Sequence, residues 1–118
     1  PYADGVYRGS YAEDGGEQVA LEFTLQNNAF TELHYTTLQY KGEDYLAGEN
    51  EAAAQIGGQF DQLLDHLVSK PVSSVSDLYL PGQIADDTDV SSGATLRAPK
   101  VISAIWDALG RHAYTIIR

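Results

Sequence analysis

The sequence contains no cysteine, which excludes disulfide bonds, thiolate metal sites and cysteine nucleophiles. Basic residues are scarce: there are 7 lysines and arginines against 17 aspartates and glutamates, and the formal net charge is −10. This balance argues against a nucleic-acid backbone or an anionic membrane surface as partner. No apolar run approaches the roughly 20 residues of a membrane-spanning helix, so no transmembrane segment is expected.

The remaining composition is that of an ordinary globular chain. Hydrophobic residues make up 43% and charged residues 20% of 118 positions. A chain of this size is expected to form one domain, residues 1–118, with its own core. The chain begins at Pro1 rather than at a methionine, and no signal peptide is visible. We therefore expect it to be a processed or trimmed piece.

The first 40 residues read as antiparallel strands. Strands are expected over Gly5–Ala12, Gln18–Gln26 and Phe30–Tyr40, with a loop over Glu13–Gly16. The second strand alternates strictly and places four apolar side chains on one face: Val19, Leu21, Phe23 and Leu25. Asn27–Asn28 tolerate positive φ and predict a tight hairpin turn.

Helical spacing replaces this alternation over Glu49–Val68. The apolar stripe consists of Ala53, Ile56, Phe60, Leu63, Leu64 and Leu67. Gly57–Gly58 either allows another backbone to approach or breaks the helix in two, and Lys70–Pro71 closes the element. The stretch Val75–Leu80 is either a short helix or an edge strand, and Pro81–Gly82 signals a turn.

A second helix is expected over Ala98–Leu109, with Pro99 near its first turn and Gly110 as its stop. A short strand over Tyr114–Ile117 ends the chain. Strands followed by helices predict an α+β fold, a small antiparallel β-sheet with helices packed on one side.

The most informative segment precedes this last helix. It reads Asp89-Val90-Ser91-Ser92-Gly93-Ala94-Thr95. A glycine-containing turn that ends in a hydroxyl residue and opens a helix is suited to hold a phosphate, because free backbone N–H groups and the helix dipole face the anion. From local sequence alone the plain alternative stays open: Asp89 or Ser92 caps a turn, and Thr95 caps the helix.

Other constellations are weaker. A calcium loop beginning at Asp87 would lack glycine at its sixth position and place Ala98 where the glutamate belongs. Asp65–His66 has no second ligand at metal spacing and is read as a solvated pair. The sequence contains no nucleophile elbow, dinucleotide-binding glycine motif or zincin motif.

The segment resembles the flavinylation motif of FMN-binding domains, Asp-x-x-(Ser/Thr)-Gly-Ala-(Thr/Ser). The family also opens with a pattern like Asp-Gly-x-Tyr-x-Gly, which Asp4–Gly9 fits. The order of strands, hairpin and helices is similar over nearly the whole chain. Ser91 departs from the family, which usually has an apolar residue there, and the stretch Pro71–Asp86 is longer than the common spacing.

The resemblance implies FMN as cofactor, joined by a phosphoester bond to Thr95. A separate, metal-dependent flavin transferase would attach it, because no histidine lies in the motif to activate the hydroxyl. Gly93 and Ala94 would leave room for the transferase and the phosphate. Asp89 would be part of what the transferase recognises, and Ser92 would add a hydroxyl donor.

On this reading the chain is an electron carrier rather than a stand-alone enzyme. It would relay electrons between redox donor and acceptor proteins, outside the cytoplasmic membrane as most of the family's members do. The alternatives are a non-covalent FMN-binding protein or small flavin reductase, and a non-redox interaction module. The flavin ring needs flat walls; candidates are Tyr7, Tyr35, Tyr40 and Tyr79, whereas Trp106 is read as core or as a partly covered flank.

Overall fold

A computed structural model describes residues 2–13, 15–84, 94–111, 113 and 115–116 of the chain. Three long antiparallel strands form most of the sheet: β1 (Gly5–Glu13), β2 (Gly16–Gln26) and β3 (Ala29–Tyr40). Two-residue strands extend its edges, β4 (Glu43–Asp44) beside β3 and β5 (Thr115–Ile116) beside β1. The strand order is β4-β3-β2-β1-β5, and the predicted antiparallel sheet is confirmed.

A two-residue turn joins β2 to β3. Asn27 and Asn28 have φ angles of 53° and 62°. Two consecutive positive φ angles are what a type I′ hairpin turn requires, and asparagine tolerates them. The Asp4 side chain accepts a hydrogen bond from the Asn27 N–H at 2.9 Å, which ties the beginning of the chain to this turn. The predicted turn is confirmed.

The alternation of β2 is also confirmed. Its four predicted apolar side chains are all at most 3% exposed: Val19, Leu21, Phe23 and Leu25. The pairing with β3 shifts register between Ala20 and Leu21 and again between Thr24 and Leu25. At both places the extra residue belongs to β3, Thr36 at the first and Thr31 at the second, so the alternation of β2 continues without interruption.

Helix α1 spans Glu51–Leu67. Asn50 is its N-cap, and the Asn50 side chain accepts a hydrogen bond from the Ala53 N–H at 2.8 Å. The helix runs unbroken through Gly57–Gly58, so the break is not observed. Instead, a Cβ added at Gly57 would lie 2.6 Å from the carbonyl oxygen of Tyr45, which confirms the close backbone approach.

Two 3₁₀ helices follow α1: η1 (Val72–Tyr79) and η2 (Pro81–Gln83). Of the two alternatives for Val75–Leu80, the helical one is therefore correct. Val72, Val75 and Leu78 are buried, so η1 contributes to the core rather than to a sheet edge.

Helix α2 spans Ala94–Leu109. One apolar face of α2 is buried, and it consists of Ala98, Val101, Ile102, Ala104, Ile105, Ala108 and Leu109. The predicted start at Ala98 is wrong by four residues. Pro99 consequently lies inside the helix and not in its first turn. The helix ends before Gly110 as expected, and β5 lies within the predicted final strand.

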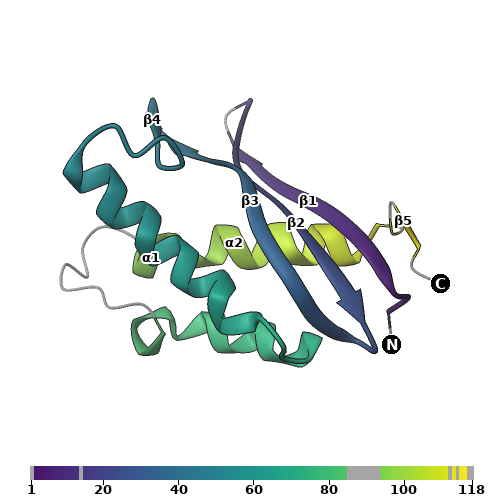
Figure 1. Ribbon diagram of the computed structural model, residues 1–118. Helices are drawn as coiled ribbons and strands as arrows, with labels where there is room; N and C mark the ends of the chain where they lie inside the picture. The colour runs from purple at the N-terminus through teal and green to yellow at the C-terminus, as the bar shows by residue number, and fades with distance from the viewer. Residues whose placement is uncertain (1, 14, 85–93, 112, 114, 117–118) are drawn as a thin grey trace.

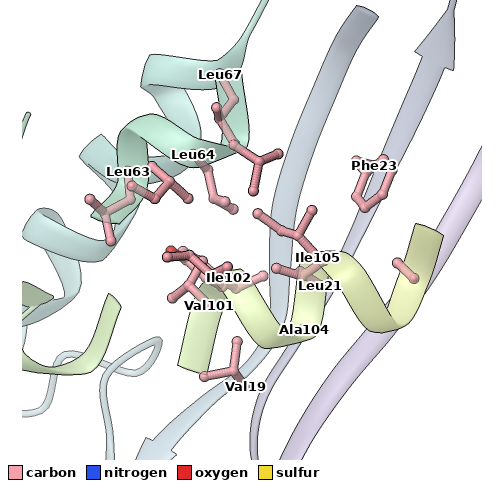
Figure 2. Packing of buried hydrophobic residues seen from close by; sticks show 14 of the residues in the cluster. Val19, Leu21, Phe23, Leu63, Leu64, Leu67, Val101, Ile102, Ala104 and Ile105 are labelled. Atoms are coloured by element: carbon pink, nitrogen blue, oxygen red, sulfur yellow. The ribbon is translucent and has the colours of Figure 1, made fainter. Parts of the chain in front are cut away.

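Both α-helices cover the same face of the sheet, which makes the fold α+β as predicted (Figure 1). Leucines of α1 point toward aliphatic side chains of α2, and Leu21 and Phe23 line the same core from β2 (Figure 2). Phe23 stacks on Tyr7 with ring centroids 5.5 Å apart and meets Phe30 edge-on at 5.1 Å. The sheet's opposite face carries no helix in the described part of the chain.

Candidate functional site

The predicted attachment site falls at the start of α2. Asp89, Ser92 and Gly93 lie outside the described residues. Ala94 and Thr95 are the first two residues of α2 by their backbone, and their side chains lie outside the description. Since the helix begins at Ala94, the N-cap position precedes it. The alternative in which Thr95 caps the helix is therefore wrong.

The start of α2 has backbone N–H groups that no carbonyl within the helix can pair. The first four N–H groups of any α-helix have no carbonyl partner within the helix, and in α2 these include residues 94–96. The dipole of a 16-residue helix adds partial positive charge at the same end. The first turn contains no acidic residue that would compete for these donors. Such a helix start is suited to a phosphate group.

Pro99 weakens the hydrogen bonding of this turn. In an α-helix the N–H of residue 99 would donate to the carbonyl of Thr95, four residues earlier. Proline has no N–H, and its ring crowds that same carbonyl. The Thr95 carbonyl therefore lacks its helical donor, and the turn that carries the predicted attachment residue is held less firmly than the rest of α2.

The Asp4–Gly9 segment, which matches the family's opening pattern, has structural roles. Asp4 binds the hairpin turn, and the Tyr7 hydroxyl donates to the carbonyl of Ala3 at 2.7 Å. A Cβ at Gly9 would overlap the backbone of α2 at Ala104 and Ala108. Gly9 therefore lets α2 pack directly on β1. Ala104, which Gly9 contacts, lies nine residues after Thr95, about 14 Å along the helix axis. The Asp4–Gly9 segment therefore does not line the start of α2.

The structure separates the aromatic candidates for a flavin wall. Tyr7 and Tyr35 are only 3% and 8% exposed and belong to the core. The Tyr35 hydroxyl donates to the carbonyl of Phe60 at 2.7 Å, and burial, with smaller contributions from two nearby aspartates, raises the pKa of Tyr35 well above its usual range. Tyr79 is largely exposed on η1. Trp106 is 45% exposed, so it lies at the flank of α2 and not in the core.

Tyr40 differs from these residues because it is half-buried beside the first half of α2. The ammonium of Lys100 lies 4.2 Å from the centroid of the Tyr40 ring and 5.9 Å from that of Tyr11. It also donates a hydrogen bond to the side-chain oxygen of Gln18 at 2.5 Å and lies 3.8 Å from a carboxylate oxygen of Glu13. A cation is thus fixed between strands and helix.

Two adjoining hollows lie near this cation, and Lys100 lines only the smaller one. A cavity of about 10 Å³, room for roughly one water molecule, lies between Lys100, Tyr45 and Phe60. A wider surface hollow of about 230 Å³ shares three lining residues with it: Gln18, Gln39 and Tyr40. The sequence reading missed Lys100. The available signal was the one basic residue of the predicted helix Ala98–Leu109, five positions after Thr95, in a chain with few cations.

The described histidines lie elsewhere. Asp65–His66 was read as a solvated pair, but the His66 Nε2 lies 2.9 Å from a carboxylate oxygen of Asp77 on η1. His34 lies 3.8 Å from Glu22 on the open face of the sheet. Among the residues the structure describes, no three histidine or carboxylate side chains are grouped closely enough to hold a metal ion.

The helices in the described ranges are all too short or too polar to cross a membrane. Comparison of the chain with family models, with curated proteins and with solved structures finds no match.

Proposed function

We propose that this chain is a flavin-carrying electron-transfer domain, with FMN joined to Thr95 by a phosphoester bond. One observation carries the proposal: the Asp89–Thr95 segment, with its resemblance to a flavinylation motif, runs directly into the first turn of α2. The α+β fold, with its hairpin and two helices, agrees with the order of elements that the resemblance implies.

The described residues suit such a group. Backbone N–H groups of residues 94–96 would hold the phosphate, and the helix dipole would stabilise its charge. FMN supplies reversible transfer of one or two electrons, while the protein positions it and adjusts its potential. Gly93 and Ala94 have no bulky side chain that would crowd the attachment point.

The domain would be the substrate of a flavin transferase and not its own catalyst. A threonine hydroxyl needs a neighbouring base to become nucleophilic. His34 lies on β3, and His66 near the end of α1 is engaged by Asp77. With FAD as flavin donor, the Thr95 oxygen would bond to the FMN phosphorus, AMP would leave with the electrons of the broken bond, and a base of the transferase would take the proton.

The weak first turn supports access by that enzyme. A transferase must reach the Thr95 hydroxyl. Because Pro99 has no N–H to donate to the Thr95 carbonyl, opening the turn around that hydroxyl costs less free energy. After loading, the domain would serve a redox donor and a redox acceptor protein, and its acidic surface would favour basic partners. An extracytoplasmic location is part of the same proposal.

The test is co-expression with a flavin transferase, followed by intact mass and peptide mapping. The protein should gain the mass of FMN less one water, on Thr95. Thr95→Ala should abolish the gain, whereas Ser91→Ala, which restores the apolar type usual in the resembling family, should keep it. Flavin on another residue would refute the assignment.

Two other outcomes would replace the proposal. Flavin that binds but is released on denaturation would indicate a non-covalent FMN-binding protein or small flavin reductase. A folded protein that takes up no flavin, beside a transferase proven active on another substrate, would indicate a non-redox interaction module.

A further inference from the structure

We propose that the solvent-facing side of α2 is the surface on which the flavin transferase docks, with Trp106 as its main contact. The exposed residues on this side are Pro99, Ser103 and Trp106, followed by Gly110, and together they form the outer row of α2. The inference rests on the proposed attachment of FMN to Thr95. It adds where the attaching enzyme holds the domain.

The first argument is the helical register. Successive residues of an α-helix are rotated by about 100°, and the Gly110 N–H still donates to the Trp106 carbonyl at 3.0 Å. Counted from residue 95, all four positions of the outer row fall within an arc of about 80°. The backbone of Thr95 therefore lies at one end of the row, about 16 Å along the axis from Trp106. A protein bound along the row extends toward the attachment residue.

The second argument is the composition of the outer row. None of its four residues is charged, although aspartate, glutamate, lysine and arginine make up 20% of the chain. The centres of protein interfaces are depleted of charge, and tryptophan is enriched among the residues that contribute most to binding. Trp106 is 45% exposed, so its side chain is accessible to a partner. Pro99 adds a second apolar contact, whereas the short side chain of Ser103 contributes space between them and no contact of its own.

The third argument is the border of the outer row toward β1. The Lys100 ammonium lies 3.8 Å from a carboxylate oxygen of Glu13, and Asp107 pairs with Arg111 at 3.2 Å. Asp107 also accepts a hydrogen bond from the Ser10 N–H of β1. These opposite charges compensate one another within the domain and form a polar rim. An uncharged centre beside a polar rim is the usual arrangement of a protein interface.

The lack of acidic residues indicates which partner binds here. The transferase brings FAD, and the diphosphate of FAD is negatively charged. A carboxylate on the outer row would repel this group, but the row and the first turn of α2 contain none. In a chain with 17 acidic residues, this leaves an approach to Thr95 without repulsion from the row. Basic redox partners would instead be attracted to the acidic surface elsewhere on the domain.

The contact test measures flavinylation kinetics with purified transferase and FAD. Trp106→Gln should raise the KM for the domain about tenfold or more and leave kcat unchanged, because loss of the main contact weakens docking but not the chemistry at Thr95. Tyr2→Gln is the matched control. Tyr2 is also an exposed aromatic residue, but its backbone N–H binds Asn28 at the hairpin turn, so this variant should keep both constants. Circular dichroism checks that both variants fold.

The charge test adds one carboxylate to the outer row. Ser103→Glu should raise the same KM, because the new charge repels the transferase with its bound FAD. The increase should shrink as salt is added, since salt screens the repulsion. Gln55→Glu adds the same charge at an exposed position of α1 and should leave the KM unchanged.

A KM for Trp106→Gln or Ser103→Glu no higher than that of its control would overturn the docking surface. Normal flavinylation of Trp106→Gln, combined with slower electron transfer from the loaded domain to an acceptor protein, would also overturn it and assign the outer row to a redox partner. Thr95 would still carry flavin in both cases. Absence of flavin on Thr95 of the unchanged domain would instead refute the proposed function itself.

Discussion

Two adjacent glycines in α1 have different surroundings. A Cβ at Gly57 would lie 2.6 Å from the Tyr45 carbonyl oxygen, whereas a Cβ at Gly58 would meet no atom within 4 Å. Both residues are equally helical, so helix propensity favours alanine at either position. Only the close backbone contact at Gly57 opposes it.

This pair gives a controlled prediction. Gly58→Ala should raise the free energy of unfolding by roughly 0.5–1 kcal/mol, the propensity difference between the two residues. Gly57→Ala should lower it by about 1–3 kcal/mol, because the methyl group forces α1 away from Tyr45. Urea denaturation followed by circular dichroism measures both. Stabilisation by Gly57→Ala would show that the two segments are not in contact.

The carboxyl group of Asp61, also on α1, predicts that the free energy of unfolding depends on pH. Burial, followed by the charge of Asp65, raises the pKa of Asp61 above its ordinary value of 3.8. The folded state therefore binds this proton more tightly than the unfolded chain. Ionisation costs stability as pH rises from 3.8 through the raised folded value, and the full cost remains at neutral pH.

Asp61→Asn should accordingly stabilise the protein at about pH 7 and have little effect at about pH 3, where the carboxyl is protonated in both states. Asp107→Asn provides the contrast. The Asp107 side chain accepts a hydrogen bond from the Ser10 N–H and pairs with Arg111, so its charge is favourable and its loss should destabilise. Urea midpoints for each variant at both pH values give the comparison.

At the scale of elements, the local pattern predicted most of the fold. The alternation of Gln18–Gln26 was sufficient to predict a strand, and the apolar stripe of Glu49–Val68 was sufficient to predict a helix. Each pattern reflects which side chains face the core. The start of α2 was not predictable in this way. Proline is common in the first turn of a helix, so Pro99 suggested a helix that begins near Ala98.

Sequence patterns predicted less of the candidate site than of the fold. The motif at Asp89–Thr95 was visible in the sequence, but Tyr40 and Lys100 are 60 residues apart and meet only through the pairing of β3 with the sheet and the packing of α2 upon it. No local periodicity encodes such a contact. Tyr7 and Tyr35 looked equally available, because burial of a tyrosine depends on which face of its strand the helices cover.

Replacing Pro99 tests the weakness of the first turn of α2. Pro99→Ala restores an N–H for the Thr95 carbonyl and should stabilise the domain by roughly 1–2 kcal/mol. The helical gain approaches 3 kcal/mol but is offset by about 1 kcal/mol of added freedom in the unfolded chain.

If the transferase needs this turn open, the same variant should also be flavinylated more slowly. Ser103→Ala, at an exposed position of α2, is the control and should change stability by about 0.5 kcal/mol or less without slowing the reaction. Calorimetry and a time course of flavin incorporation supply the two readouts. Faster flavinylation of Pro99→Ala would contradict the role assigned to the turn.

For the whole molecule, the net charge of −10 predicts a response to salt. Like charges repel across a compact fold, whereas surface ion pairs such as Arg8–Glu22 contribute little. Raising the ionic strength from about 0.01 M to about 0.15 M shortens the screening length from about 30 Å to about 8 Å. The urea midpoint should therefore rise. A fall would indicate that favourable ion pairs outweigh the repulsion.

The pairing of β5 with the beginning of β1 allows the order of the chain to be rearranged. Gly5 pairs with Ile116 and Val6 with Thr115, so the two ends of the fold meet at one edge of the sheet. A short flexible linker could join them, and a new opening at the Asn27–Asn28 turn would cut no strand and no helix. A circularly permuted chain of this kind should keep the sheet and both helices while its new ends lie at the hairpin turn. A redox partner or an electrode tether could then be fused at that turn and would leave the start of α2 unobstructed.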